Sequence, residues 1–378
     1  MNPLPHPPTT STATMKVDED AAVNAGILPA EHWSAQLGIS DDKSLFDSDK
    51  ESTKSLYPSI FKYRTIHGRT YHPETTDAMY WATNDRTQAE SLDINHHCCT
   101  LALEGKLFLS PLDKKTCKTA LDIGTGTGIW AIDFAEEFKQ TTVTATDITP
   151  VAPSYIPPNL TFEIEDCNKT WAFPNNHFDF IHIRWLNGSV TDWERLFERA
   201  SAHMRAGGWL ESYEMSAIVE SDDGSVTKTS ALGQWGKIFI EGGRKFGMSF
   251  TVFQDGMQRT AMEKAGLVDI QEREIKMPIG SWPTDDAAKE QGTFTQAALE
   301  QDTEGYILFM AETLGWTKRQ VLIYVKNVRR EMRSKKYHGF YRQKVVWGRK
   351  PENPAGPVGP ERAKTAPSSA AKRKASED

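Results

Sequence analysis

The sequence predicts an α/β fold built on a mostly parallel, doubly wound sheet with helices on both faces. Two observations carry this prediction. Short segments rich in β-branched and aromatic residues alternate with segments of helical period, which is typical of a parallel sheet. A glycine-rich loop also joins one predicted strand to the next helix. No internal repeat is present, so a solenoid is not predicted. We place this domain at residues 56–350.

A helix over about residues 87–105 is predicted to precede the sheet. Its apolar stripe recurs at spacings of three and four residues and consists of Ala89, Leu92, His96, Cys99 and Leu103. The sequence HHCC at 96–99 lies within this helix but is not expected to bind a metal. Neighbouring helical side chains point roughly 100° apart and do not converge on one ion. We therefore interpret His96 as a buried structural histidine.

The sequence DIGTGTG at residues 122–128 follows a predicted strand and opens the next helix. Its glycines are Gly124, Gly126 and Gly128, and they allow a tight turn with backbone N–H groups close to a ligand. A P-loop is excluded because no Lys-Ser/Thr pair follows, and the dinucleotide pattern is broken because Ile129 stands where it needs glycine. Asp122 would repel a pyrophosphate but attract an ammonium group, such as that of S-adenosylmethionine (SAM).

Acidic residues also follow the next two predicted strands. Asp147 ends the second strand, 25 residues after Asp122, and can accept hydrogen bonds from both hydroxyls of a ribose. The third strand, 160–164, is followed by Asp166 and Cys167, where a carboxylate and a backbone N–H suit an adenine. Ligands of open α/β sheets bind at these carboxyl ends. The alternative, that the acids only cap helices or turns, does not explain why all three are in phase with the strands.

Several segments resemble the fungal LaeA-like branch of the class I SAM-dependent methyltransferases. They are HGRTYH at 67–72, NDRTQAESLDINHH at 84–97, LDIGTGTGIWAIDFAEEF at 121–138, DITP at 147–150, PPNL at 157–160, FDFIHIRWLNGSVTDW at 178–193, AGGWLESYE at 206–214 and WGRKP at 347–351. The resemblance covers about residues 63–351. It implies a Rossmann-like fold of the class I methyltransferase type, with a helical N-terminal lid and C-terminal helical additions.

The resemblance also implies roles for single residues in binding SAM. Asp122, Gly124, Gly126 and Gly128 would hold its methionine end, Asp147 the ribose, and Asp166 with the backbone of Cys167 the adenine. Two positions depart from the branch. Ser91 stands where an arginine is usual, which concerns contacts of the lid with the cofactor, and Ala206 replaces the proline of a P-G-G turn.

His182 and Arg184, at the end of the predicted strand 178–184, are the candidate catalytic residues. Methyl transfer from SAM is an in-line displacement in which the protein mainly positions the nucleophile. A general base helps a hydroxyl acceptor, and a histidine with a pKa near ~6.5 suits that role. The alternative is that His182 is buried in a central strand and hydrogen-bonded for structure.

The C-terminal third predicts two helices at 233–248 and 252–266, a strand at 268–282 that leaves the sheet, and a basic amphipathic helix at 317–336. The apolar face of that last helix consists of Val321, Val325, Val328 and Met332. We interpret it as an outer helix of the fold, with contact to a partner as the alternative. Bulky aromatics either fill the core or line an acceptor pocket: Trp235, Phe239, Phe246, Phe250, Phe253 and Trp282.

Composition excludes several other classes of protein. The 378 residues include 44 Lys and Arg against 51 Asp and Glu, whereas a general nucleic-acid binder would be basic, so no direct nucleic-acid binding is expected. Four cysteines without a CxxC pair predict neither a disulfide scaffold nor a zinc site. No apolar run approaches the ~20 residues of a membrane span, and no secretory signal is recognised. We expect a cytoplasmic protein that does not bind membranes.

Both ends of the chain are predicted to be disordered, because their polar, proline-rich composition cannot offset the entropy of ordering. We place these segments at 1–55 and 351–378. The second contains Lys-Arg-Lys at 372–374, which is either a nuclear import signal or part of a solvated tail.

Three functions remain in competition. The first is a SAM-dependent methyltransferase that modifies a hydroxyl or carboxyl of a small-molecule fungal secondary metabolite. The second is a nuclear, LaeA-like regulatory methyltransferase that acts with protein partners to control secondary metabolism and development. The third is a SAM-binding interaction module with little turnover.

Overall fold

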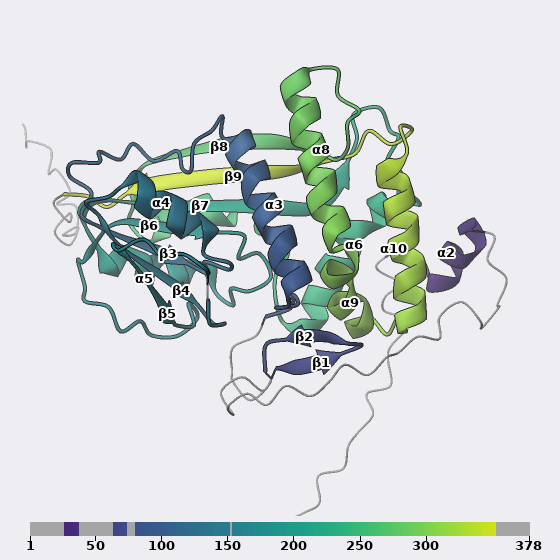
Figure 1. Ribbon diagram of the computed structural model, residues 1–378, viewed down its shortest axis with the longest axis horizontal. Coiled ribbons are helices and arrows are strands. Elements are labelled where there is room, and N and C mark those ends of the chain that lie inside the picture. The colour runs from purple at the N-terminus through teal and green to yellow at the C-terminus, as the bar shows by residue number, and fades with distance from the viewer. Residues whose placement is uncertain (1–25, 38–62, 74–79, 152, 353–378) are drawn as a thin grey trace, which may run out of the picture.

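A computed structural model describes residues 26–37, 63–73, 80–151 and 153–352 (Figure 1). Its main sheet has seven strands in the order β5-β4-β3-β6-β7-β9-β8. They are β3 (Thr119–Ile123), β4 (Thr142–Asp147), β5 (Leu160–Ile164), β6 (Phe178–Arg184), β7 (Met204–Glu220), β8 (Val268–Pro278) and β9 (Phe340–Arg349). Neighbours from β5 to β7 pair in parallel, and β9 runs antiparallel to both β7 and β8. The predicted doubly wound, mostly parallel sheet is therefore confirmed, and its order reverses between β3 and β6.

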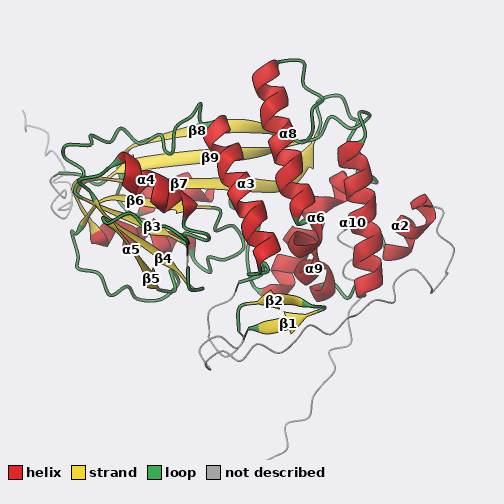
Figure 2. Ribbon diagram, viewed as in Figure 1, coloured by secondary structure: helices red, strands yellow, loops and turns green. Residues whose placement is uncertain are grey.

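The helices form two groups (Figure 2). One group lies on the half of the sheet that contains β3 to β6, and the other lies at the far half of the sheet. The helices are α2 (Ala30–Leu37), α3 (Arg86–Ala102), α4 (Ile129–Glu137), α5 (Trp193–His203), α6 (Ala231–Phe246), α7 (Met257–Lys264), α8 (Asp286–Gln301), α9 (Thr303–Thr313) and α10 (Lys318–Arg333); a small hairpin joins β1 (Arg64–Ile66) to β2 (Arg69–Tyr71). No helix within these described ranges is long and apolar enough to cross a membrane.

Side chains along β3 point alternately to the two faces of the sheet, and apolar side chains lie on both. This explains why helices cover both faces of the first half of the sheet. Ala120 packs with the buried side chains of α4 on one face. Leu121 and Ile123 pack with those of α5 and α7 on the other. Because both faces are buried, the central strands read as nearly continuous apolar runs.

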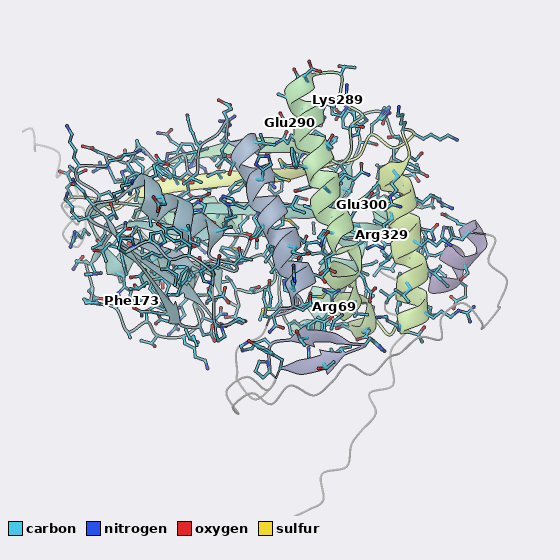
Figure 3. All side chains as sticks on the ribbon, viewed as in Figure 1. Arg69, Phe173, Lys289, Glu290, Glu300 and Arg329 are labelled. Atoms are coloured by element: carbon cyan, nitrogen blue, oxygen red, sulfur yellow. The ribbon has the colours of Figure 1, made fainter. Side chains whose placement is uncertain are left out.

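A larger core lies in the C-terminal half, where α6, α9 and α10 pack around the far ends of β7 and β9. The predicted apolar face of α10 is buried there. Its basic residues mostly bond within the fold. Arg333 pairs with Glu300 of α8 at 2.8 Å. Arg329 Nη2 donates to the Glu300 carbonyl at 3.2 Å, and Figure 3 labels both of these residues. These contacts support the interpretation of α10 as a helix of the fold.

Two expectations about segments are corrected. Part of the N-terminal segment expected to be disordered forms α2, which packs on α10. Trp33 is fully buried against Tyr324 in an edge-to-face contact at 5.1 Å, and its carbonyl accepts a hydrogen bond from Asn327. Burial of one tryptophan offsets the polar composition around it. The strand at 268–282 does not leave the sheet, because β8 pairs with β9 from Gln271 to Pro278 as its edge.

The remaining predicted disorder, at 1–25, 38–55 and 353–378, lies outside the described residues, as does the basic cluster at 372–374.

Candidate active site

A cavity of about 600 Å³ lies at the carboxyl ends of β3 to β6, with α3 as its opposite wall. This volume is in the range of small-molecule sites. Eight of the nine candidate residues line it: Asp122, Gly124, Gly126, Asp147, Asp166, Cys167, His182 and Arg184. Gly128 is not among the residues that line the cavity. Segments far apart in the sequence therefore converge at the switch in strand order, where open α/β sheets bind ligands.

The three glycines of the loop serve different purposes, although all have positive φ. A Cβ at Gly124 would lie 2.4 Å from Leu186, and one at Gly128 would lie 2.7 Å from the Phe162 ring. These two glycines therefore allow the loop to pack against its neighbours. At Gly126 the nearest atom, in Leu92, would be 3.8 Å away, so this glycine faces open space in the cavity and leaves room for a ligand.

Asp147 is bound to the backbone of the same loop. Its Oδ2 accepts a hydrogen bond from Gly126 N–H at 2.9 Å, and its Oδ1 accepts one from Thr149 N–H at 2.9 Å. Burial raises the pKa of Asp147 to about 6, although both N–H groups favour the ionised form. Each oxygen keeps a further lone pair. The half-buried carboxylate can thus accept two more hydrogen bonds from a bound diol.

Asp122, His182 and Trp130 form a buried unit beneath the glycine loop. Asp122 Oδ1 lies 2.7 Å from His182 Nδ1, and the imidazole stacks on Trp130 at 3.6 Å with 5° between the planes. Burial lowers the pKa of His182 despite Asp122. Because an ionised carboxylate only accepts, Nδ1 carries the proton. His182 Nε2 has no hydrogen-bond partner within the described part of the chain.

Arg184 is tied to α3 and α4 through His96. Arg184 Nη2 donates to His96 Nδ1 at 3.1 Å, and His96 Nε2 donates to Asp133 Oδ2 at 2.9 Å. A guanidinium only donates, so this tautomer of His96 follows. Burial lowers the pKa of His96. His96 is therefore a buried histidine in a bonded chain, as the apolar stripe predicted.

The segment before α3 and the first turns of α3 form the opposite wall of the cavity, where the resemblance implied a helical lid. The residues lining the cavity from this side are Tyr80, Thr83, Asn84, Asp85, Gln88, Ala89, Leu92, Asp93 and Asn95. The Asp93 carboxylate accepts a hydrogen bond from the Thr127 hydroxyl at 2.7 Å, which joins this wall to the glycine loop. The resemblance of 84–97 to the LaeA-like branch was the one signal that pointed to this segment.

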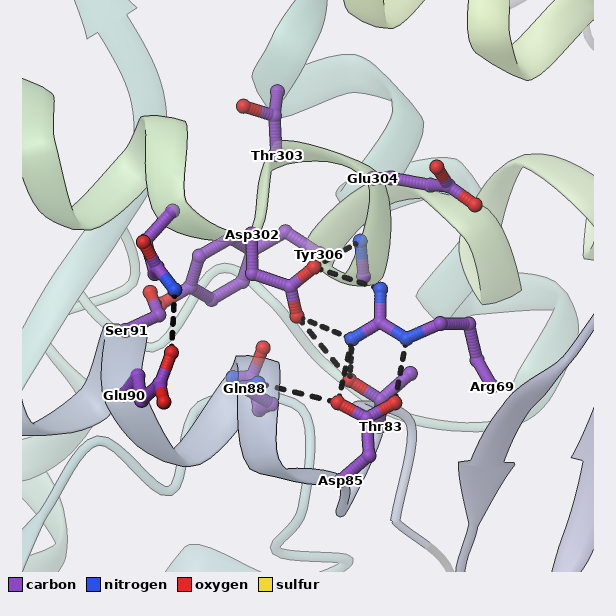
Figure 4. Close-up of polar contacts among 12 residues, drawn as sticks. Arg69, Thr83, Asp85, Gln88, Glu90, Ser91, Asp302, Thr303, Glu304 and Tyr306 are labelled. Atoms are coloured by element: carbon purple, nitrogen blue, oxygen red, sulfur yellow. Dashed lines mark hydrogen bonds and ion pairs between the residues drawn. The ribbon is translucent and has the colours of Figure 1, made fainter.

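Arg69 holds the start of α3 against the C-terminal helices (Figure 4). Its Nε donates to Asp85 Oδ2 at 2.5 Å, and its Nη2 donates to Asp302 Oδ2 at 2.7 Å. Asp85 caps α3 by accepting from Gln88 N–H, and Asp302 caps α9. One arginine on β2 thus joins two helix N-termini.

The structure corrects the expected consequence of Ser91. Its hydroxyl donates to the Ala298 carbonyl at 2.7 Å and lies 2.9 Å from the Tyr306 hydroxyl. Ser91 therefore points toward α8 and α9 rather than into the cavity. The departure from the branch at Ser91 therefore does not fall among the residues that line the cavity.

A second, apolar cavity of about 70 Å³ adjoins the first. The two share four lining residues, Tyr80, Gln88, Leu92 and Trp185. Three of the aromatics identified in the sequence, Trp235, Phe239 and Phe250, line the second cavity. The other three, Phe246, Phe253 and Trp282, line neither cavity.

The loop after β6 separates the two cavities. Trp185 has φ +60°, in the left-handed region, and its N–H donates to the Tyr213 carbonyl. The N–H groups of Leu186 and Asn187 both donate to the buried Glu214 carboxylate at 3.0 Å. This carboxylate satisfies the loop's buried donors and keeps Trp185 at the boundary between the cavities.

Known proteins with similar sequences are methyltransferases and regulators. A family described as "Methyltransferase domain" matches residues 94–272. Methyltransferase pytC of Aspergillus terreus is 33% identical over 318 residues, which cover 84% of this chain and 96% of that protein. The probable methyltransferase tdiE of Emericella nidulans is 32% identical, covering 79% and 93%. The secondary metabolism regulator LAE1 of Cochliobolus heterostrophus is 28% identical, covering 76% and 94%.

Among solved structures, phosphoethanolamine N-methyltransferase 2 of Haemonchus contortus in complex with SAM is 17% identical, with a TM-score of 0.39, covering 69% of this chain and 52% of that one. The strand order, the glycine loop and the sequence relatives agree on one family. The chain belongs to the LaeA-like class I SAM-dependent methyltransferases.

Proposed function

We propose that this enzyme methylates a small-molecule secondary metabolite, at a hydroxyl or a carboxyl, with SAM in the large cavity and the acceptor in the apolar one. The carrying observation is that the two cavities share a wall. The polar cavity has the size and polarity for a charged nucleoside. The apolar cavity, at about 70 Å³, suits only an apolar part of the acceptor. The fungal relative LAE1, which is named a secondary metabolism regulator, supports a role in fungal secondary metabolism.

The residues present fit SAM. Gly126 leaves open space beside the loop, and Asp147 presents free lone pairs toward the same cavity. We assign Asp147 to the ribose, Asp166 and the Cys167 backbone to the adenine, and Asp122 to the ammonium group. Gly124 and Gly128 act by shaping the loop. When bound, SAM supplies the methyl group from its sulfonium.

His182 is proposed to orient Asp122 rather than to remove a proton from the acceptor. It lines the cofactor cavity but not the apolar cavity, so its unpaired Nε2 lies on the cofactor side, and Asp122 and Trp130 hold the ring. Arg184 is likewise confined to the cofactor cavity, where His96 holds it. Transfer then depends mainly on placing the acceptor in line with the methyl group.

The test is to incubate the purified chain with methyl-labelled SAM and extracts of its own organism. A labelled small molecule of apolar character supports the proposal. Label on a protein, or binding of SAM without any transfer, would contradict it and favour the regulator or the interaction module.

The regulatory function is the second candidate, because several relatives are named secondary metabolism regulators. It would require nuclear location and protein partners, whereas the enzyme is proposed to be cytoplasmic. Imaging the full chain and a chain lacking 353–378 distinguishes them. Nuclear accumulation that is lost with the tail would favour the regulator.

A further inference from the structure

The apolar cavity contains no charged side chain. None of the described residues that line it is Asp, Glu, Lys, Arg or His. Arg184, the cation of the site, belongs to the cofactor cavity and bonds to His96. A carboxylate that entered the apolar cavity would lose its hydration without meeting a cationic side chain, which is unfavourable.

Three buried polar atoms nevertheless belong to residues that line this cavity, and two of these residues, Gln88 and Trp185, line the cofactor cavity as well. The atoms are Gln88 Oε1, Trp185 Nε1 and Asn187 Oδ1, and none has a hydrogen-bond partner among the residues that the structure describes. Buried polar groups in proteins are nearly always paired. Two of these atoms accept hydrogen bonds and one donates. Together they define what a ligand must offer.

The three groups are fixed in place. Asn187 donates its Nδ2 to the Met215 carbonyl at 3.2 Å, and its N–H donates to Glu214. Gln88 lies on the first turn of α3, which the Arg69 cluster holds (Figure 4). Trp185 is held in the left-handed region by the pairing described above. The Asn187 side chain and the backbones that carry Gln88 and Trp185 are therefore held in place before a ligand binds.

We infer that the part of the acceptor that enters the apolar cavity is neutral and mostly apolar, that its hydroxyl or N–H donates to Gln88 or Asn187, and that carboxylates are rejected. The inference rests on the proposed function and narrows it from a hydroxyl or carboxyl to a donor-bearing group. The side-chain oxygens of Gln88 and Asn187 only accept hydrogen bonds, so without a nearby cation they repel a carboxylate. A hydroxyl can donate a hydrogen bond to either of them. Trp185 Nε1 can in turn donate to the oxygen of that hydroxyl.

The experiment compares three small probes of similar shape: p-cresol, p-xylene and p-toluate. Each is titrated into the full chain saturated with S-adenosylhomocysteine, and binding is measured by ligand-observed NMR at pH 7.5. We expect p-cresol to bind at least about tenfold more tightly than p-toluate, and several-fold more tightly than p-xylene. Gln88→Leu should remove the preference for p-cresol over p-xylene. The matched control Gln271→Leu, at an exposed position of β8 that lines neither cavity, should keep it.

Equal or tighter binding of p-toluate would overturn the inference, as would an unchanged preference in Gln88→Leu. The ranking of probes is measured on the unaltered chain, so the inference is tested even where the Gln88 variant does not fold. Calorimetry with S-adenosylhomocysteine alone separates the two proposals. Failure of that binding would overturn the proposed function, whereas intact binding with the wrong probe ranking overturns only this inference.

Discussion

The cofactor cavity and the apolar cavity share a wall but are built in different ways. The first is made by the ends of neighbouring parallel strands, and its polar contacts involve backbone N–H groups, as at Asp147. The second is made by side chains from α3, α6, α10 and the far half of the sheet. The backbone geometry of the first cavity suits a cofactor that is the same in all members of the family. Side-chain packing is free to vary with the acceptor, so differences in substrate between relatives should concentrate in the second cavity.

The strongest expected effect breaks the first cavity alone. Gly126→Asp places a side chain and a negative charge in the open space of the loop, in a backbone conformation that disfavours side chains. We expect calorimetry to show no binding of S-adenosylhomocysteine. Gly224→Asp is the matched control, because Gly224 also has positive φ and free space but lies outside both cavities. A folded Gly126→Asp chain with normal binding would refute the assignment of the loop.

The next variant breaks the wall that the two cavities share. Arg69→Ala leaves Asp302 buried without its cation, and losing one partner of a buried pair costs about 3–5 kcal/mol. We expect the free energy of unfolding in urea to fall by that amount. Arg86→Ala, on an exposed arginine of α3, should change it by less than about 1 kcal/mol. Similar losses of unfolding free energy in both variants would show that the ion pairs of Arg69 with Asp85 and Asp302 contribute no more than an exposed pair.

A substitution of Asp147 sharpens the comparison of the two cavities, because it should affect the binding of the cofactor and not that of the acceptor. Asp147→Ala should weaken SAM binding by about 1–3 kcal/mol, the cost of leaving polar partners unsatisfied. The wild-type affinity should also fall as pH drops through about 6, because the protonated carboxyl loses acceptor capacity. Asp147→Asn should remove that pH dependence. A large fall in melting temperature without cofactor would instead identify Asp147 as structural.

The same pKa fixes the sign of this residue's effect on folding. The folded-state pKa of Asp147, about 6, exceeds the ordinary value near ~3.9. The folded chain therefore binds the proton more tightly, and Asp147 contributes stability below pH 4 that is lost as pH rises toward 6. Urea unfolding of wild type and Asp147→Asn at pH 4.5 and 7 measures this difference. A wild type that gains stability relative to Asp147→Asn over this interval would contradict the assignment.

The smallest expected effect concerns His182. Asn preserves a donor toward Asp122, so His182→Asn should change turnover by only a few-fold. The dependence of the rate on pH should also keep the shape that it has in wild type. If His182 were the general base, turnover would fall by roughly 10²–10⁴-fold. Rates with and without the substitution, measured from pH 5.5 to 8.5, distinguish the two roles.

The contrast between the cavities also explains which parts the sequence could predict. Asp122, Gly126 and Asp147 lie at the ends of strands with clear patterns, so their convergence follows from the fold class. The sequence does not show what faces a helix from elsewhere in the chain. Ser91 was therefore assigned to the wrong surroundings, and Gln88 was overlooked although it borders both cavities.

Two further misses have the same physical cause. α2 has only eight residues, half of them polar, and the burial of Trp33 against α10 explains why it forms. The position of Trp185 depends on Glu214, which lies 29 residues later on a neighbouring strand. Such long-range contacts leave no periodic pattern in the sequence.

The central claim is that cofactor and acceptor occupy separately built cavities, and a variant that fills only the second tests it most directly. Ala217 is a buried residue of β7 that lines the apolar cavity and not the cofactor cavity. In Ala217→Leu we expect affinity for S-adenosylhomocysteine to stay within about twofold of wild type, while transfer of labelled methyl to the acceptor falls at least about tenfold. Equal loss of both in a folded variant, or full turnover with the cavity filled, would contradict the account.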